Sequence, residues 1–255
     1  MDLNGHSAIV TGGGSGIGEA TAKMLAGKGM KVAIWDMNLD GAQRVANEIG
    51  GEAIQVDVSD AGEAEGAMEK TSVSVGVPRV LINCAGIGPA RTIVNRNGDP
   101  MPLDDFAKVI KVNLIGTFNC MRLSAAAMSK ADPLDGGERG VIINTASVAA
   151  FEGQIGQAAY SASKGGVVGL MMPAMRELGR HGIRVLTIAP GYIETPLLAQ
   201  VPPDFQENLK SSQIFPRTRF GQPEEYGQLC IAICENQMLN GDTIRLDAGT
   251  RMPPK

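Results

Sequence analysis

Tyr160 and Lys164 stand four residues apart in a stretch of helical length, so both side chains would project from one helix face. A tyrosine ordinarily titrates near pKa ~10, and an ammonium group a few ångströms away stabilises the phenolate and lowers that pKa. Such a tyrosine can pass a proton to or from an alcohol oxygen. Ser147, 13 residues earlier, could hold that oxygen beside it. Because an isolated Tyr/Lys pair is more often an ordinary helix surface, this chemistry needs further support.

A glycine-rich segment supplies part of that support. Between a short apolar run and a helical stretch lie Thr11, Gly12, Gly13, Gly14, Ser15, Gly16, Ile17 and Gly18. Glycines let the backbone approach a pyrophosphate closely, and a helix N-terminus offers it unpaired N–H groups. The segment therefore predicts a dinucleotide site, although glycine-rich turns also occur for structural reasons alone.

Asp36 ends the second apolar run, 18 residues after Gly18. This is close to the roughly 20-residue spacing at which an acid accepts hydrogen bonds from the adenosine ribose. A carboxylate there would repel the additional phosphate of NADP, and neither Gly14-Ser15 nor Met37-Asn38 offers a basic residue to attract it. NAD is therefore the predicted cofactor. Capping of the following helix is the alternative role for Asp36.

Apolar runs alternate with stretches of helical length along the chain. The predicted strands are residues 7–10, 31–35, 52–56, 79–82, 140–143, 183–188 and 243–246. The predicted helices are residues 18–28, 39–48, 60–73, 103–128, 157–180 and 223–234. Continuous hydrophobicity suits strands covered on both faces. The order predicts a single α/β domain, residues 1–255, with a Rossmann-like, doubly wound, parallel seven-stranded sheet and helices on both faces.

Several positions refine this plan. Pro173 lies deep in a predicted helix, where it removes a backbone donor, so we expect a kink or a boundary there. Residues 91–102 and 131–139 are polar and are predicted to form surface loops. The third and fourth strands end in Asp57-Val58 and Asn83-Cys84-Ala85-Gly86, whose small residues would leave space for a flat ring at the binding edge of the sheet.

The combined motifs resemble the classical short-chain dehydrogenase/reductase family over nearly the whole chain. They are residues 11–18, Asn83-Cys84-Ala85-Gly86, Asn113, Ser147, Tyr160-x-x-x-Lys164 and Pro190-Gly191. The resemblance implies a catalytic tetrad of Asn113, Ser147, Tyr160 and Lys164, in which Asn113 holds a water that extends the proton path. It also implies that Thr195 binds the nicotinamide carboxamide. Cys84 replaces the second asparagine of the family's usual Asn-Asn-Ala-Gly.

Residues 140–164, 189–198 and 239–252 resemble a narrower branch of that family, the 3-hydroxyacyl-CoA and hydroxysteroid dehydrogenases. This resemblance implies short-chain 3-hydroxyacyl-CoA substrates, a homotetramer, and Gln157 near the substrate. It would place these residues around NAD: Ser15, Ile17, Asp36, Asp57, Val58, Cys84, Ile193 and Thr195. Residues 87–102 and 195–216, the loops that usually set substrate choice, match less closely and leave the substrate open.

Composition argues against several other classes of protein. A formal charge of −4 gives no general reason to expect nucleic-acid binding, and no apolar run approaches the roughly 18 residues of a membrane span. The four cysteines lack CxxC spacing, and Cys230 and Cys234 suit one buried helix face, so reduced thiols and no metal are expected. His6 and His181 suit surface or strand-edge positions. We expect a cytoplasmic protein, or a mitochondrial matrix protein if the source is eukaryotic.

The leading hypothesis is the reversible oxidation of a short-chain 3-hydroxyacyl-CoA to the 3-oxoacyl-CoA, with Tyr160 as acid/base, Ser147 and Gln157 near the substrate and NAD as hydride acceptor. Lys164 can hydrogen-bond the nicotinamide ribose. A broader secondary-alcohol, sugar-alcohol or hydroxysteroid dehydrogenase is the second hypothesis, because specificity depends on loops. The third hypothesis is a non-catalytic NAD-binding scaffold. The presence of Ser147, Tyr160 and Lys164 argues against it, because a scaffold has no chemical need for all three.

Overall fold

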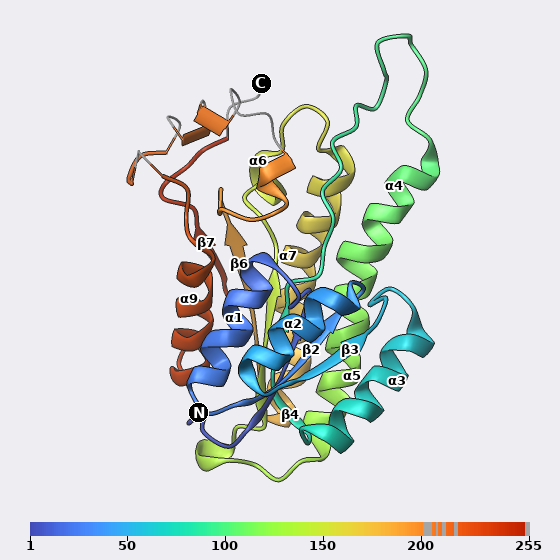
Figure 1. The fold of residues 1–255 in the computed structure, drawn as a ribbon. Coiled ribbons are helices and arrows are strands. Elements are labelled where there is room, and N and C mark those ends of the chain that lie inside the picture. Colours follow the sequence, from blue (N-terminus) through green and yellow to red (C-terminus); the bar gives the residue numbers. More distant parts are fainter. Residues whose placement is uncertain (201–205, 208, 211–212, 217–218, 253–255) are drawn as a thin grey trace.

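Seven parallel strands form one sheet in the computed structural model, which describes residues 1–252 except 201–205, 208, 211–212 and 217–218 (Figure 1). Their order is β3-β2-β1-β4-β5-β6-β7. The bounds are β1 (Ser7–Thr11), β2 (Lys31–Asp36), β3 (Glu52–Gln55), β4 (Pro78–Asn83), β5 (Gly140–Thr145), β6 (Ile183–Pro190) and β7 (Thr243–Leu246). The predicted parallel, doubly wound sheet is confirmed.

The helices lie between the strands along the chain. They are α1 (Gly16–Gly27), α2 (Leu39–Ile49), α3 (Ala61–Ser74), α4 (Leu103–Ile110), α5 (Gly116–Lys130), α6 (Ala149–Glu152), α7 (Ala158–Leu178) and α9 (Pro223–Glu235). Short 3-10 turns occupy Asp135–Gly137, Gly179–His181 and Leu198–Gln200. The short helix α6 is absent from the sequence prediction, because four residues carry no periodic pattern.

A π-helical turn, Lys111–Ile115, corrects the prediction of one α-helix over residues 103–128. The chain stays helical through it, but the hydrogen-bond spacing widens between α4 and α5. Such single π-turns inside α-helices are often found at functional sites. This one contains Asn113, which is completely buried.

Two helical layers cover the sheet. Ala8 and Val10 of β1 pack with the buried residues of α1, α2 and α9, whereas Ile9 packs with those of α3, α5 and α7. Successive strand side chains point to opposite faces, so both faces must be apolar. This explains why the strands appear in the sequence as continuous apolar runs. In Figure 1, α1 and α9 lie together on one side of the sheet.

Pro173 does not end its helix: α7 continues to Leu178, so of the two expected effects, a kink or a boundary, the boundary does not occur. Pro173 removes the helical partner of the Gly169 carbonyl, four residues earlier. Both residues are exposed, so that carbonyl lies on the solvent side of α7. The cost of the proline is therefore lower there than on the buried face.

The predicted surface loops are confirmed, with one antiparallel bridge, Val94 to Pro100, inside the first. That loop projects beyond the start of α4 (Figure 1). All four cysteines are free, and Cys230 and Cys234 are buried on α9 as predicted. Across the described residues, no helix is long and apolar enough to span a membrane, and no cluster of three or more potential ligands could hold a metal ion.

Candidate active site

The strand order reverses direction between β1 and β4, so the carboxyl ends of these strands border a crevice. Gly12 follows β1 with a φ of +64° and packs against the turn that follows β4. A Cβ on Gly12 would lie 2.8 Å from the backbone nitrogen of Ala85. A Cβ on Gly18 would overlap the carbonyl oxygen of Gly12. These glycines allow the N-terminus of α1 to face the crevice directly.

The start of α1 keeps its backbone donors available. Ser15 precedes the helix and its side chain makes no capping hydrogen bond. Thr195, from the loop after β6, lies on the other side of the turn, 3.4 Å from a Cβ placed on Gly16. Ile17 is half-buried beside the core of α1, α2 and α9. The glycine turn and the loop after β6 therefore lie side by side at the start of α1, and pyrophosphate binding there stays a prediction.

Asp36 orients the glycine turn. Its Oδ2 accepts a hydrogen bond of 2.9 Å from the Gly14 N–H, and its Oδ1 accepts one of 2.9 Å from the Asn38 N–H. Asn38 itself caps α2, by accepting from the Gly41 N–H, so the capping role considered for Asp36 belongs to Asn38. The carboxylate of Asp36 thus stands where the turn and the end of β2 meet.

Arg44 of α2 lies beside the glycine turn, and the sequence analysis did not identify it. Its Nη2 donates to the Gly14 carbonyl at 3.2 Å and pairs with Glu19 at 2.6 Å, while Nη1 lies 3.2 Å from Glu48. The hydrogen bond from Arg44, with help from Lys23, lowers the pKa of Glu19 to about 2. The charge of Arg44 is therefore already matched by carboxylates.

Asp57 and Val58 lie just beyond the end of β3, and both contact neighbouring parts of the protein. Asp57 accepts hydrogen bonds from the N–H and hydroxyl of Ser59 at 2.9 and 2.6 Å. Val58 is buried and packs against Gly116 at the start of α5. They shape the edge of the crevice through their own turn.

Asn83 forms a contact between two strand ends. Its side chain is buried and donates to Asn144 Oδ1 of β5 at 2.9 Å, which ties the two strand ends together. The following residues are more accessible: the Ala85 N–H is held by the Thr11 hydroxyl at 3.1 Å, and Cys84 is half-buried. Burial raises the pKa of the Cys84 thiol to about 11, so this cysteine is a neutral group.

Asn113 and Lys164 converge on Gly86. The Asn113 amide makes two hydrogen bonds with the Ile87 backbone, at 2.8 and 2.9 Å, and donates to the Ser163 hydroxyl at 3.0 Å. A Cβ on Gly86 would lie 3.2 Å from Asn113 Oδ1 and 3.5 Å from Lys164 Nζ. The π-turn, α7 and the β4 turn therefore meet at one point.

Lys164 is buried, with 4% of its surface exposed, and its Nζ donates to the Thr145 carbonyl at 2.8 Å. Burial lowers the pKa of Lys164 to about 8. Tyr160 lies on the same face of α7, with its ring centroid 5.8 Å from Nζ. Burial raises the pKa of Tyr160, and a hydrogen bond with Ser147 partly offsets this.

The prediction that Lys164 lowers the pKa of Tyr160 is therefore wrong in this structure. The ammonium donates to the Thr145 carbonyl and lies 5.8 Å from the centre of the tyrosine ring, and the desolvation of the tyrosine dominates its pKa. The spacing of four residues correctly placed both side chains on one face. The spacing could not show that the Lys164 ammonium donates to the Thr145 carbonyl.

The remaining predicted residues surround this centre. Ser147 accepts from the Ala149 N–H at 3.1 Å, and Gln157 Oε1 accepts from the Gln154 N–H at 3.0 Å just before α7. Pro190 ends β6, Ile193 is buried, and Thr195 Oγ1 donates to the Ile193 carbonyl at 3.2 Å. Ser147, Pro190, Ile193 and Thr195 lie at or just beyond the carboxyl ends of β5 and β6, whereas Gln157 lies at the start of α7.

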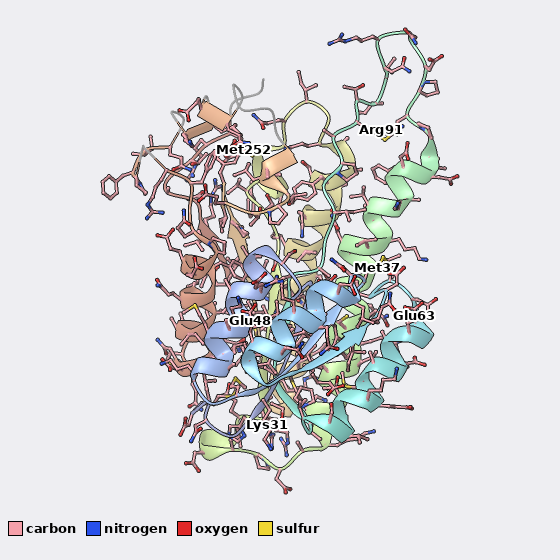
Figure 2. All side chains as sticks on the ribbon, viewed as in Figure 1. Lys31, Met37, Glu48, Glu63, Arg91 and Met252 are labelled. Atoms are coloured by element: carbon pink, nitrogen blue, oxygen red, sulfur yellow. The ribbon has the colours of Figure 1, made fainter. Side chains whose placement is uncertain are left out.

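A cavity of about 520 Å³ opens from this centre. Gly86, Ile87 and Gly88 line it, and a Cβ on Gly88 would lie 3.5 Å from Cε2 of Tyr160. The outer part is lined by Arg91, Met101, Asp105 and Lys108, and Figure 2 shows Arg91 beside the start of α4. Sequence reasoning missed this α4 wall, although Asp105, Lys108 and Val109 have the spacing of one helix face.

The sequence analysis also did not identify the contact between Thr145 and Tyr226. Tyr226 of α9 is completely buried, and its hydroxyl lies 2.7 Å from Thr145 Oγ1 and 3.9 Å from Cys84 Sγ. This contact joins α9 to the strand end whose carbonyl holds Lys164. A tyrosine within an apolar helix carries no sequence signal for such a role.

Comparisons with known proteins agree with this geometry. The family model of short chain dehydrogenases matches residues 6–206. Human 3-hydroxyacyl-CoA dehydrogenase type-2 is 47% identical over 255 residues, covering 99% of this chain and 97% of the human protein. A crystal structure of 3-hydroxyacyl-CoA dehydrogenase type-2 from Mycobacterium avium covers 100% of both chains with a TM-score of 0.93 and 38% identity.

A crystal structure of 3-ketoacyl-(acyl-carrier-protein) reductase from Brucella melitensis is similar as well, and it was determined in complex with NADH. It aligns with a TM-score of 0.87 and 31% identity, covering 98% of this chain and 100% of that one. The predicted site residues described above lie within this shared fold.

Substituting Gly18 by Ala should weaken NADH binding by at least about tenfold, because the new Cβ overlaps the Gly12 carbonyl and must displace the glycine turn. Gly27→Ala, at the other end of α1, is the control: a Cβ there meets nothing within 4 Å. It should leave binding unchanged and add up to about 1 kcal/mol of stability. NADH fluorescence titration and urea unfolding measure the two effects. Equal NADH affinities in both variants would contradict pyrophosphate binding at the glycine turn.

Lys164→Met tests the buried ammonium. The pKa of Lys164 is about 8 in the folded protein and 10.5 when unperturbed, so the unfolded chain binds more protons between these values. The free energy of unfolding of the wild type should therefore rise with pH across this window, relative to Lys164→Met. We expect a relative gain of about 2 kcal/mol between about pH 7.5 and about pH 9.5, measured by urea unfolding. Parallel pH profiles would show that the ammonium is not buried.

Proposed function

This chain belongs to the short-chain dehydrogenase family, and we propose that it catalyses the reversible oxidation of a short-chain 3-hydroxyacyl-CoA to the 3-oxoacyl-CoA with NAD. The observation that carries the proposal is the convergence of Asn113, Lys164 and Tyr160 beside a cavity that starts at the cofactor crevice. The names of two relatives supply the substrate class, since the human protein at 47% identity and the Mycobacterium avium protein at 38% identity, both similar over nearly the full length, are 3-hydroxyacyl-CoA dehydrogenases.

The residues present fit a nicotinamide dinucleotide. Gly12, Gly16 and Gly18 leave space at the start of α1 that a Cβ would fill or strain, and Ser15 leaves the helix donors uncapped. Asp36 would accept the adenosine ribose hydroxyls, and Thr195 would bind the carboxamide. Bound NAD supplies an acceptor for the hydride that leaves the alcohol carbon.

Tyr160 and Ser147 act on the substrate oxygen. The side chain of Tyr160 borders the cavity at Gly88. For oxidation the phenol first releases its own proton along the path past Lys164, and the resulting phenolate receives the alcohol proton while the Ser147 hydroxyl fixes the oxygen's position. Because burial holds the pKa of Tyr160 above its ordinary value, the phenol is protonated at rest and is also suited to donate in the reverse direction.

Lys164 and Asn113 organise the surroundings of that tyrosine. An ammonium has three donors, and the Thr145 carbonyl uses one of them, so two remain for the nicotinamide ribose and the proton path. Both N–H donors of the Asn113 amide are used, by the Ile87 carbonyl and the Ser163 hydroxyl, and its oxygen accepts from the Ile87 N–H, which fixes the segment after β4 against α7. Asn113 thereby holds the cavity wall in place, and the water that the family resemblance implies beside it stays a prediction.

The preference for NAD over NADP rests on Asp36. Its carboxylate lies at the end of β2, where an additional ribose phosphate would meet a negative charge. Arg44 contacts the turn at the Gly14 carbonyl, and Glu19 and Glu48 already neutralise it.

A homotetramer also forms part of the proposal. It is supported by two exposed apolar side chains: Ile115 at the end of the π-turn is 50% exposed, and Phe118 in the first turn of α5 is 47% exposed.

Tyr160→Phe tests the mechanism with NAD and 3-hydroxybutyryl-CoA as substrates. Loss of the phenol should lower the initial rate of NADH formation, followed by absorbance, by about 100-fold or more, because the alcohol proton has no acceptor. NADH binding should stay within about twofold as the fold control. Turnover of a steroid or a polyol in place of the CoA ester would keep the mechanism and reject the substrate. Tight NADH binding without any turnover would favour a scaffold.

Asp36→Ala tests cofactor choice. Removing the carboxylate deletes the ribose acceptor and the repulsion of a 2′-phosphate, so kcat/KM for NAD should fall by about tenfold or more while that for NADP rises. Asp40→Ala, an exposed carboxylate in the first turn of α2, is the control and should change neither value. An unchanged NAD to NADP ratio in Asp36→Ala would assign the preference elsewhere.

A further inference from the structure

We propose that Lys108 is a phosphate-binding residue for the CoA portion of the substrate, at the outer end of the cavity. The inference rests on the proposed function, and it deepens that function by locating the part of the site that distinguishes a CoA thioester from other secondary alcohols. It follows from the distribution of charge along one cavity and from the position of Lys108 on α4.

The two ends of the cavity differ in charge. At the inner end, the lining residues Gly86, Gly88, Ala159 and Leu197 are uncharged, and Tyr160 lies directly beside Gly88. The charged residues among those lining the cavity lie further out: Asp105 and Lys108 on α4, and Arg91 at the start of the projecting loop. The cavity therefore suits a ligand whose reacting end is neutral and whose far end carries charge.

The ion pairs of the outer lining residues determine the net charge of the cavity wall, and hence the charge that a ligand should carry there. Arg91 Nη1 pairs with Asp105 Oδ2 at 2.7 Å, so these two groups neutralise each other. Lys108 forms no ion pair with any carboxylate in the described part of the chain, including Asp104 and Asp105 on its own helix. One positive charge is left uncompensated at the cavity wall. An anionic group is the complementary ligand.

The position of Lys108 suits a phosphate remote from the reacting atoms. It precedes Asn113 by five residues, which places its Cα roughly 8 Å further along the helix axis. The flexible lysine stem adds reach toward the mouth of the cavity. A short 3-hydroxyacyl group at Tyr160 would therefore leave its pantetheine arm directed outward, past Lys108.

Chemistry separates CoA from the other candidate substrates. A CoA ester carries phosphates beyond its pantetheine arm, whereas neutral hydroxysteroids and sugar alcohols carry no anionic group to match Lys108. Phosphate oxygens form charge-assisted hydrogen bonds with an ammonium. The same uncharged inner cavity would serve all these alcohols, so Lys108 is the feature that favours the CoA ester.

The experiment compares two thioesters that react identically: 3-hydroxybutyryl-CoA and S-(3-hydroxybutyryl)pantetheine, which lacks every phosphate. Lys108→Met should lower kcat/KM for the CoA ester by about five- to tenfold, through KM, and leave the pantetheine ester unchanged. Lys108→Glu should enlarge the loss for the CoA ester alone. The wild-type rate on the CoA ester should also fall more steeply with salt than that of Lys108→Met.

Lys111→Met is the matched control, because Lys111 is an exposed cation one turn further along that does not line the cavity. It should leave both thioesters unaffected. Equal losses for the two thioesters in Lys108→Met, or no loss for either, would overturn the proposal. So would an equal effect of Lys111→Met, since that would indicate only a diffuse field.

Calorimetric titration with CoA itself separates this proposal from the proposed function. If wild-type protein oxidises neither thioester but binds CoA more tightly than Lys108→Met, the phosphate site stands and the assigned reaction fails. If the two proteins bind CoA equally, the phosphate site fails even when the CoA ester is oxidised.

Discussion

The buried ammonium of Lys164 is the interaction on which the arrangement of this site depends. Removing a charge from water costs several kcal/mol, and the cost must be offset by well-placed acceptors. Only 4% of Lys164 is exposed, and the Thr145 carbonyl accepts from it at 2.8 Å. That carbonyl is held in turn because β5 pairs with β6 through Thr145 and because Tyr226 bonds the Thr145 hydroxyl. Thus α9, on the far face of the sheet, helps to position a residue of α7.

The hydrogen bonds of Asn113 fix a second part of the site, the cavity wall formed by α4 and the segment after β4. Asn113 satisfies both backbone groups of Ile87, and the π-turn that contains it separates α4 from α5. Because the turn is widened rather than broken, one continuous helical segment can line the cavity with α4 and pack α5 into the core. The same segment therefore links the chemistry at Gly86 to the outer wall at Lys108. Disturbing the π-turn would move both together.

The sequence predicted the parts of this structure that depend on local pattern. Seven apolar runs predicted the sheet, and the glycines with Asp36 predicted the crevice, since those features follow from strand burial and close backbone approach. The direction of Lys164 was not predictable, because it depends on a carbonyl 19 residues away in sequence. Arg44, Tyr226 and the π-turn were missed for the same reason: each is defined by partners on other elements or by hydrogen-bond spacing that residue type does not encode.

Substrate choice in this molecule is separable from the fold. The sheet, the glycine turn and Tyr160 depend on close packing and on contacts within the protein, and they would serve any secondary alcohol that fits. Lys108 is exposed, contributes nothing to the core and lies on a helix face whose neighbour Val109 is buried. Its ammonium forms no ion pair among the described residues. An unpaired cation at the wall of a cavity attracts an anionic ligand. The family's chemistry is therefore set by buried groups, whereas selection of a CoA ester falls to a surface residue that the fold leaves free to vary.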